Sequence, residues 1–200
     1  MLNIAHACVT EAVNGPGRRF TVWVQGCSLA CPGCFNPELR AREARRLLSA
    51  AELAQEALEA LPWEGVTLSG GEPFDQAADL AAFLEGLGSA RDPFPVIAFS
   101  GHALEELWDG PAPRRELLAR IDLLVEGPYL AERSAALPLR GSANQRLVAL
   151  TPRGLAQRAR VAAEARRSGV SVVVGADGTV VLSGFPPEAL VERLGRRLEP

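Results

Sequence analysis

Lysine is absent from the 200-residue sequence, in which all 21 basic side chains are arginines. The chain therefore cannot form a lysine Schiff base, use a lysine general base or hold phosphate through a Walker-type lysine. Histidine is scarce as well. Only His6 and His102 occur, which leaves little room for a histidine-rich metal site. The single methionine, Met1, excludes a methionine-lined binding groove.

Long hydrophobic runs are also missing. No segment approaches the roughly 20 apolar residues of a membrane-spanning helix, and the first residues lack the basic stretch and apolar run of a secretory signal. We therefore expect a cytoplasmic protein without a membrane partner. The formal net charge of −3 argues against nucleic acid as a partner.

Cysteine is sparse but clustered, because three of the four cysteines form a C-x3-C-x2-C triplet of Cys27, Cys31 and Cys34. Thiolates this close repel one another unless a cation neutralises them, so the triplet indicates metal binding in a reducing compartment. Structural zinc takes four protein ligands. Three cysteines could instead hold three irons of a 4Fe–4S cluster and leave the fourth iron open.

The spacing alone leaves alternatives open. A zinc site or an electron-transfer cluster could recruit Cys8 or His6 as the fourth ligand. Cys8 lies in the apolar stretch 4–9, where we expect a buried small hydrophobic residue. An open metal position would mark a reactive site instead, because a substrate or cofactor must fill it.

A glycine-rich turn, Ser69-Gly70-Gly71-Glu72-Pro73, follows a strand predicted at residues 66–68. Backbone groups at the carboxyl end of a parallel strand bind ligands well, and glycine allows a ligand to approach closely. Glu72 adds a negative charge, which suits an ammonium group or ribose hydroxyls better than phosphate. On its own, the same pattern would also fit an ordinary turn.

In their order along the chain, these motifs resemble those of the radical S-adenosylmethionine (radical SAM) superfamily, and within it the activating proteins of anaerobic ribonucleotide reductase and pyruvate formate-lyase. The resemblance covers roughly the first three-quarters of the chain. The segments that carry it are Asn14-Gly15-Pro16-Gly17-Arg18-Arg19-Phe20, the cysteine triplet with Phe35-Asn36-Pro37, Thr67 to Phe74, Phe99-Ser100-Gly101, Asp122 to Tyr129 and Arg140-Gly141-Ser142-Ala143-Asn144-Gln145-Arg146.

The resemblance implies cofactors and site residues. The three cysteines would be the catalytic centre and the metal ligands, holding a 4Fe–4S cluster whose open iron is chelated by the methionine amino and carboxylate groups of S-adenosylmethionine. Glu72 would be the charge partner of that amino group. The full set of cofactor-binding residues would be Ser69, Gly70, Gly71, Glu72, Ser100 and Asn36.

The resemblance also implies a reaction. One electron from the reduced cluster would break a carbon–sulfur bond of S-adenosylmethionine, and the 5′-deoxyadenosyl radical would take a hydrogen from a backbone glycine of a partner such as anaerobic ribonucleotide reductase. Flavodoxin or ferredoxin would be the electron donor. The alternatives are a radical SAM enzyme acting on another peptide or small molecule, and a metal-binding module without catalysis.

Three departures from the family pattern bear on which partner enzyme the chain activates, and not on the reaction that the resemblance implies. Gly33 precedes the third cysteine, where many superfamily members have an aromatic residue; this is similar to the ribonucleotide reductase activators. Those activators usually have Asp-Gly where this chain has Glu126-Gly127, and an aromatic residue where it has His102. We expect His102 to be a surface residue beside a helix cap.

Apolar runs and helical patterns alternate along the chain, which predicts an α/β fold with mostly parallel strands. Strands are predicted at 20–25, 66–68, 96–99, 123–126 and 147–150. Ser49 and Glu52 form a capping-box pattern that opens a helix ending near residue 61, and a second helix is predicted over 75–87. The resemblance implies a partial (β/α) barrel. Ligands would bind at the carboxyl ends of its strands.

The composition changes near residue 151. Residues 1–150 carry 13 arginines against 19 acidic residues, and residues 151–200 carry eight against five. We expect a core domain over 1–150 and an extension over 151–200, formed by an arginine-rich helix at 153–167, a hairpin with strands at 171–174 and 179–182, and a helix at 187–194. The extension is either an edge addition to the sheet or a docking surface for an acidic partner.

Several single residues have a simpler structural interpretation. Trp23, Trp63, Phe94 and Phe99 are expected in the core, because no basic residues interleave with them as in a nucleic-acid surface. The pair Arg18-Arg19 is expected to be solvated.

Overall fold

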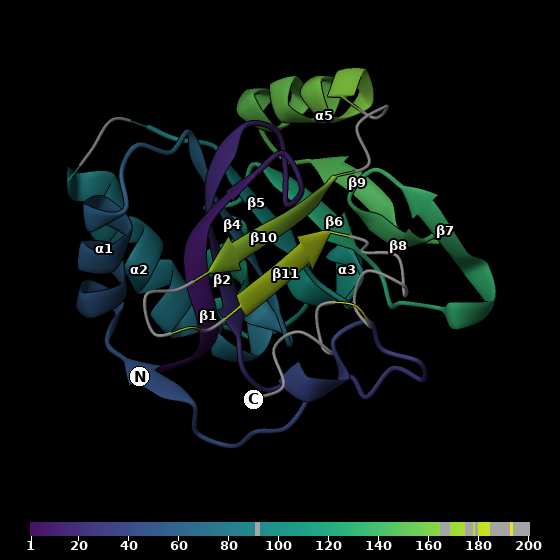
Figure 1. Cartoon of the computed structure of the whole chain (residues 1–200), viewed down its shortest axis with the longest axis horizontal. Helices are drawn as coiled ribbons and strands as arrows, with labels where there is room; N and C mark the ends of the chain where they lie inside the picture. Colours follow the sequence, from purple (N-terminus) through teal and green to yellow (C-terminus); the bar gives the residue numbers. More distant parts are fainter. Residues whose placement is uncertain (91–92, 165–168, 175–177, 179, 185–192, 194–200) are drawn as a thin grey trace.

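A seven-stranded mixed sheet forms the centre of the computed structural model (Figure 1). The structure describes residues 1–90, 93–164, 169–174, 178, 180–184 and 193. The strand order of the sheet is β3-β1-β2-β4-β5-β6-β9. The strands of this sheet are β1 (Leu2–Glu11), β2 (Arg18–Val24), β3 (Arg46–Leu48), β4 (Gly65–Gly70), β5 (Val96–Phe99), β6 (Leu123–Glu126) and β9 (Arg146–Ala149).

The four central strands β2, β4, β5 and β6 are parallel, as the alternating pattern predicts. Their short apolar runs are buried on both faces, which is typical of parallel strands covered on both sides. The expectation of mostly parallel strands is confirmed for the centre of the sheet, whereas β1 and β3 on one side and β9 on the other are antiparallel to their neighbours. The sheet is therefore mixed.

Strand β1 has no counterpart among the predicted strands. Its side chains are mostly half-buried rather than alternating between buried and exposed, so its sequence lacks a clear strand period. Cys8 lies in this strand and is half-buried rather than fully buried, which corrects its sequence-based assignment to the core. A small separate sheet, also unpredicted, pairs β7 (Ser134–Leu137) with β8 (Arg140–Ser142).

Helices connect the parallel strands, as a βαβ topology requires. The predicted capping box opens the first helix: the Ser49 hydroxyl accepts from the Glu52 N–H, and the Glu52 carboxylate accepts from the Ser49 N–H. No helix in the described ranges is long and apolar enough to cross a membrane. The helices are α1 (Ala50–Glu59), α2 (Ala77–Ala90), α3 (Leu104–Trp108), α4 (Ala112–Leu118) and α5 (Pro152–Glu164), with short 3-10 turns at Pro37–Leu39, Pro73–Gln76 and Ala131–Arg133.

The main core lies between the sheet and helices α1, α2 and α4. Apolar side chains such as Leu53, Leu80 and Leu117 are fully buried there against strand residues such as Val66. The expected core aromatics Trp23, Trp63 and Phe94 are buried, whereas Phe99 is half-buried.

Arg19 contradicts the expectation that the Arg18-Arg19 pair is solvated, because its side chain is 1% exposed. Its guanidinium donates to the Thr67 hydroxyl and to the backbone carbonyls of Val66 and Pro95. Burial lowers its pKa to about 9. Arg19 thus links β2 to β4 and to the segment that enters β5.

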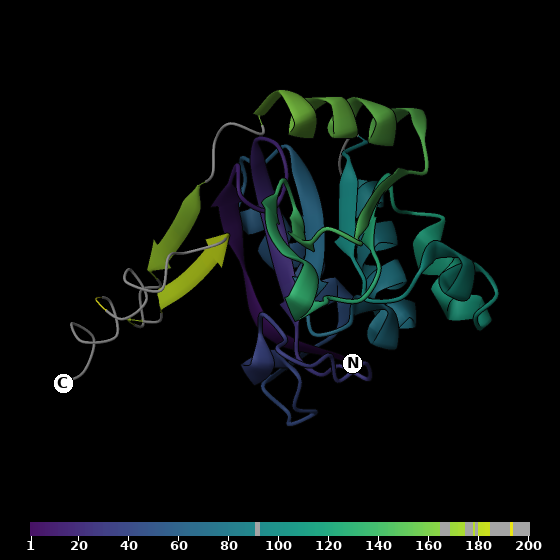
Figure 2. The same cartoon turned by 90° about the vertical axis from the view of Figure 1, so that its right-hand side faces the viewer.

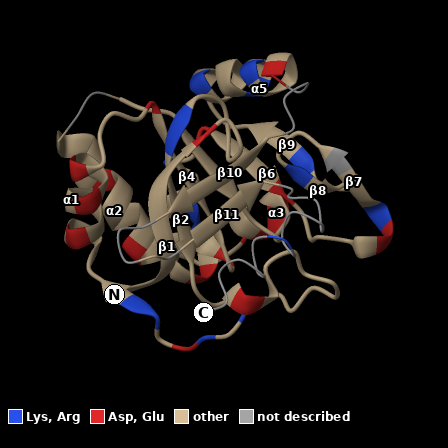
Figure 3. Ribbon diagram, in the orientation of Figure 1, with Lys and Arg blue, Asp and Glu red and all other residues tan. Residues whose placement is uncertain are grey.

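The described part of the region after residue 150 comprises α5 and a hairpin of β10 (Val170–Val174) and β11 (Val180–Gly184). Residues 165–168, most of the predicted hairpin turn and the predicted helix at 187–194, apart from residue 193, lie outside the described residues. Helix α5 carries both blue basic and red acidic positions in Figure 3. It packs on the sheet near Asp122, where Arg153 pairs with Asp122, and its Arg160 pairs with Glu64. These contacts attach α5 to the core, and whether the extension also serves as a docking surface stays a prediction.

Candidate active site

The cysteine loop begins where β2 ends, and main-chain hydrogen bonds hold its base. The Gly26 N–H donates to the Leu39 carbonyl at 2.9 Å, and the Cys27 N–H donates to the Arg40 carbonyl at 3.1 Å. Gly26 has a φ of +101°, a left-handed conformation that favours glycine. The position of Cys27 is therefore fixed by backbone contacts on both sides of the loop.

Within the loop, the Cys34 N–H donates to the Cys31 carbonyl at 3.3 Å across the predicted Pro32-Gly33 turn, where Gly33 has a φ of +67°. The Leu29 N–H lies 3.4 Å from the Cys27 sulfur and donates to it. Burial raises the pKa of the Cys27 thiol, and this hydrogen bond partly offsets the effect.

The donor set fits an iron–sulfur cluster. All four cysteines are free thiols, and Cys27, Cys31 and Cys34 line one cavity, which Cys8 does not. Among the described residues, no three Cys, His, Asp or Glu side chains are gathered closely enough to hold one metal ion. A 4Fe–4S cluster does not need that arrangement, since each cysteine binds a different iron.

The glycine-rich turn lies directly against the cysteine loop. The Gly71 N–H donates to the Val24 carbonyl at 2.8 Å, and the Glu72 N–H donates to the Gly26 carbonyl at 3.0 Å. A Cβ on Gly71 would clash with the Gly26 carbonyl, so the close approach of the two backbones requires glycine there. Gly70 has a φ of +102°.

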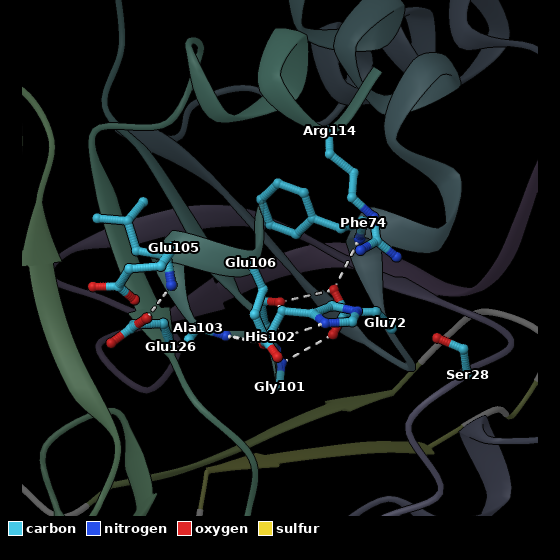
Figure 4. Close-up of polar contacts among 12 residues, drawn as sticks. Ser28, Glu72, Phe74, Gly101, His102, Ala103, Glu105, Glu106, Arg114 and Glu126 are labelled. Atoms are coloured by element: carbon cyan, nitrogen blue, oxygen red, sulfur yellow. Dashed lines mark hydrogen bonds and ion pairs between the residues drawn. The ribbon is translucent and has the colours of Figure 1, made fainter. Parts of the chain in front are cut away.

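Glu72 is the most buried acidic group at the site, with 1% of the residue exposed. Its carboxylate accepts from the Phe74 N–H at 3.0 Å, the Ser100 hydroxyl at 3.0 Å and the Gly101 N–H at 2.9 Å, so it joins the turn after β4 to the turn after β5 (Figure 4). Burial raises its pKa to about 7, against the lowering effect of these three donors.

A second acidic residue, Asp75, connects the turn to the cysteine loop. Its carboxylate accepts from both the N–H and the hydroxyl of Ser28 at 2.8 Å. The loop is thus joined to the glycine-rich turn by side chains as well as by the backbone.

All nine residues expected in the site line the same cavity. The sequence motifs at 122–129 and 140–146 also reach it, through Gly127, Tyr129, Gly141 and Gln145. Gln145 fixes the Arg140–Arg146 segment there. Its side-chain NH2 donates to the Gly127 carbonyl, and its side-chain oxygen accepts from the Gly141 N–H. Sequence reasoning missed Trp23 and Leu29, which look like ordinary hydrophobic residues, and Leu182, Ser183 and Gly184, which are far away in sequence.

His102 is not the surface residue expected from its place beside a helix, since its side chain is only 14% exposed. Burial and the nearby Arg114 lower its pKa, while Glu106, 3.7 Å away, acts in the opposite direction. Glu126, which stands where the activators usually have aspartate, is buried and accepts from the Leu104 N–H and from Arg146.

Comparisons with known proteins identify the family of the chain. Residues 13–148 match the family described as a 4Fe-4S single cluster domain. The anaerobic ribonucleoside-triphosphate reductase-activating protein of Haemophilus influenzae is 31% identical over 144 residues, which cover 68% of this chain and 90% of that protein. The protein of the same name from Vibrio cholerae is 33% identical over 148 residues with the same coverage, and that from Escherichia coli is 28% identical over 142 residues.

The family match begins at the Asn14 motif, includes the cysteine triplet and the glycine-rich turn, and ends within β9. It therefore covers every segment on which the resemblance to the activating proteins depends, and that resemblance is confirmed. The chain belongs to the 4Fe–4S, radical SAM family of the anaerobic ribonucleoside-triphosphate reductase-activating proteins.

Proposed function

We propose that this protein generates a glycyl radical on a partner enzyme of the anaerobic ribonucleotide reductase type. The observation that carries the proposal is the joining of the cysteine loop to the glycine-rich turn by the hydrogen bond from the Glu72 N–H to the Gly26 carbonyl, with both segments facing one cavity. A cluster and a nucleotide cofactor held by these two segments would be neighbours.

Cys27, Cys31 and Cys34 would hold the 4Fe–4S cluster and leave its fourth iron to S-adenosylmethionine. Together these groups supply a 5′-deoxyadenosyl radical when bound. The remaining residues of the set would bind the nucleotide cofactor: Ser69, Gly70, Gly71, Glu72, Ser100 and Asn36.

The role of Glu72 follows from its burial. Its carboxylate is removed from water, and three donors fix its position at the cavity wall. A cation offsets the cost of a buried carboxylate, so the ammonium group of S-adenosylmethionine is a fitting partner. Glu72 would also hold Ser100 in place, because the Ser100 hydroxyl donates to it.

The remaining features of the proposal concern the whole chain. The seven-stranded sheet would be the partial (β/α) barrel of the superfamily, with a core domain over 1–150 and an extension over 151–200 of helix, hairpin and helix. The protein would act in the cytoplasm. It would receive its electron from flavodoxin or ferredoxin.

The test is anaerobic reconstitution with iron and sulfide, followed by addition of S-adenosylmethionine and dithionite. Release of 5′-deoxyadenosine is the expected result. With anaerobic ribonucleoside-triphosphate reductase present, a glycine-centred EPR signal should appear. The Cys27→Ala variant should abolish both, and Cys8→Ala, matched in chemistry but outside the cavity, should abolish neither.

The outcomes separate the alternatives. Zinc at one ion per chain without cleavage of S-adenosylmethionine would indicate a metal-binding module. Release of 5′-deoxyadenosine without a glycine signal on the reductase would indicate an enzyme with another peptide or small-molecule substrate. Either result would refute the proposed function.

A further inference from the structure

The hairpin of β10 and β11 forms a wall of the active-site cavity. Leu182, Ser183 and Gly184 of β11 line it together with the cysteine loop and the glycine-rich turn. In Figure 2 the strands of the main sheet stand between this hairpin, on the left, and the teal helices on the right. The family match ends at residue 148, so this wall is an addition to the matched domain.

A buried polar contact attaches the hairpin to the core. The Asn14 carboxamide donates to the Ser183 hydroxyl at 2.6 Å and to the Thr10 hydroxyl at 3.1 Å. The Asn14 carbonyl in turn accepts from the hydroxyl of Thr67, in the strand that leads to the glycine-rich turn. Asn14 is 8% exposed and Ser183 is 7% exposed. The hairpin therefore has a defined position relative to the cofactor-binding turn.

Strand β11 of the hairpin has an edge without a strand partner among the described residues, and its other edge pairs with β10. Main-chain N–H and C=O groups on such an edge can pair with an extended polypeptide. Leu182 lies opposite Val172, which is 47% exposed, whereas Ser183 lies on the other face of the hairpin, toward Asn14.

We propose that this hairpin is the specificity-determining wall of the site, along which an extended polypeptide segment of the substrate lies, with Leu182 and Ser183 as its selecting and positioning residues. The inference rests on the proposed function and names the surface along which its polypeptide substrate binds. A hydrogen on a backbone glycine can be reached only if the polypeptide around it enters the cavity. An unpaired strand edge provides main-chain hydrogen bonds that do not depend on the side chains of the substrate.

The test uses the full-length protein, with purified anaerobic ribonucleoside-triphosphate reductase as the probe. The first measurement is hydrogen–deuterium exchange of the β11 amides in the cluster-free protein, with and without the reductase. The proposal requires slower exchange over Val180–Gly184 when the reductase is present. This readout does not depend on the activity of the loaded enzyme.

The second measurement is the KM for the reductase in glycyl-radical formation. Ser183→Ala removes the hydrogen bond with Asn14 that positions the hairpin. We expect it to raise the KM for the reductase about fivefold to tenfold, with kcat at saturating reductase within about twofold of the wild-type value. The matched control is Ser171→Ala, which replaces the residue directly opposite on β10, does not line the cavity and should leave KM unchanged. Leu182→Trp should also raise KM, because it narrows the cavity without affecting the Asn14 contact.

Two results would refute the proposed role of the hairpin without refuting the proposed function. One is a wild-type enzyme that activates the reductase while its β11 amides exchange at the same rate with and without it. The other is Ser183→Ala and Leu182→Trp variants whose KM matches that of Ser171→Ala. A wild-type enzyme that cleaves S-adenosylmethionine but never activates the reductase would refute the proposed function, and the substrate assignment of the hairpin with it.

Discussion

Replacing Glu72 with glutamine should change how the stability of the cluster-free protein depends on pH. The Glu72 carboxyl is buried, and burial raises its pKa from the ordinary value of 4.5 to about 7. Because each tenfold change in proton affinity corresponds to 1.36 kcal/mol, ionising this group in the folded protein costs about 3 kcal/mol more than in the unfolded chain.

The sign follows from proton binding. Between pH 4.5 and 7 the folded protein holds a proton on Glu72 that the unfolded chain has released, so this residue makes the free energy of unfolding fall as the pH rises. Glutamine does not titrate. Relative to Glu72→Gln, the wild-type protein should therefore lose about 2–3 kcal/mol between pH 5 and pH 8.

The assay is urea unfolding of both proteins at pH 5 and pH 8, followed by circular dichroism under reducing conditions. Other titrating groups, including His6 and His102, contribute equally to both proteins and cancel in the difference. Glutamine also disturbs the three donors around residue 72, but that cost is the same at both pH values. An equal difference in stability at pH 5 and pH 8 would refute the argument that burial controls this carboxyl.

Three further predictions test the site and its support. Alanine at any one of the three cysteines of the loop should abolish iron–sulfur absorbance after reconstitution, whereas Cys8→Ala should retain it; retained iron in a loop variant would contradict the ligand assignment. Gly71→Ala should lower the free energy of unfolding by more than about 2 kcal/mol, because the new Cβ meets backbone. Gly86→Ala, in open space on α2, should raise it by about 0.5–1 kcal/mol in the same denaturation assay, and equal effects would refute the steric argument. Arg19→Met should lower the free energy of unfolding by roughly 3 kcal/mol or more, because it leaves the buried backbone carbonyls of Val66 and Pro95 without a donor. A decrease of less than about 1 kcal/mol would show that Arg19 acts as a solvated charge.

The sequence predicts those parts of the fold whose cause is local. The central strands are short apolar runs, the Ser49 capping box forms within four residues, and the Pro32-Gly33 turn lies between two cysteines. The grouping of the cysteines with the glycine-rich turn was also predictable, because each follows a parallel strand and the carboxyl ends of parallel strands lie at one edge of a sheet.

Features that depend on distant partners were not predictable. Arg19 looks like a surface charge in sequence, yet its acceptors come from Val66 and Pro95, on other strands and loops. Ser183 is 169 residues from Asn14, so no local pattern relates the hairpin to the cavity. Strand β1 is held by its neighbours and has no strand period of its own, and sequence periodicity therefore gives no sign of it.

The backbone hydrogen bond between the Glu72 N–H and the Gly26 carbonyl has a consequence for how this chain can vary. The spacing between the cysteine loop and the glycine-rich turn is set by peptide groups, which almost every residue type carries in the same form. Side chains elsewhere in the cavity can therefore be replaced without moving the two segments apart.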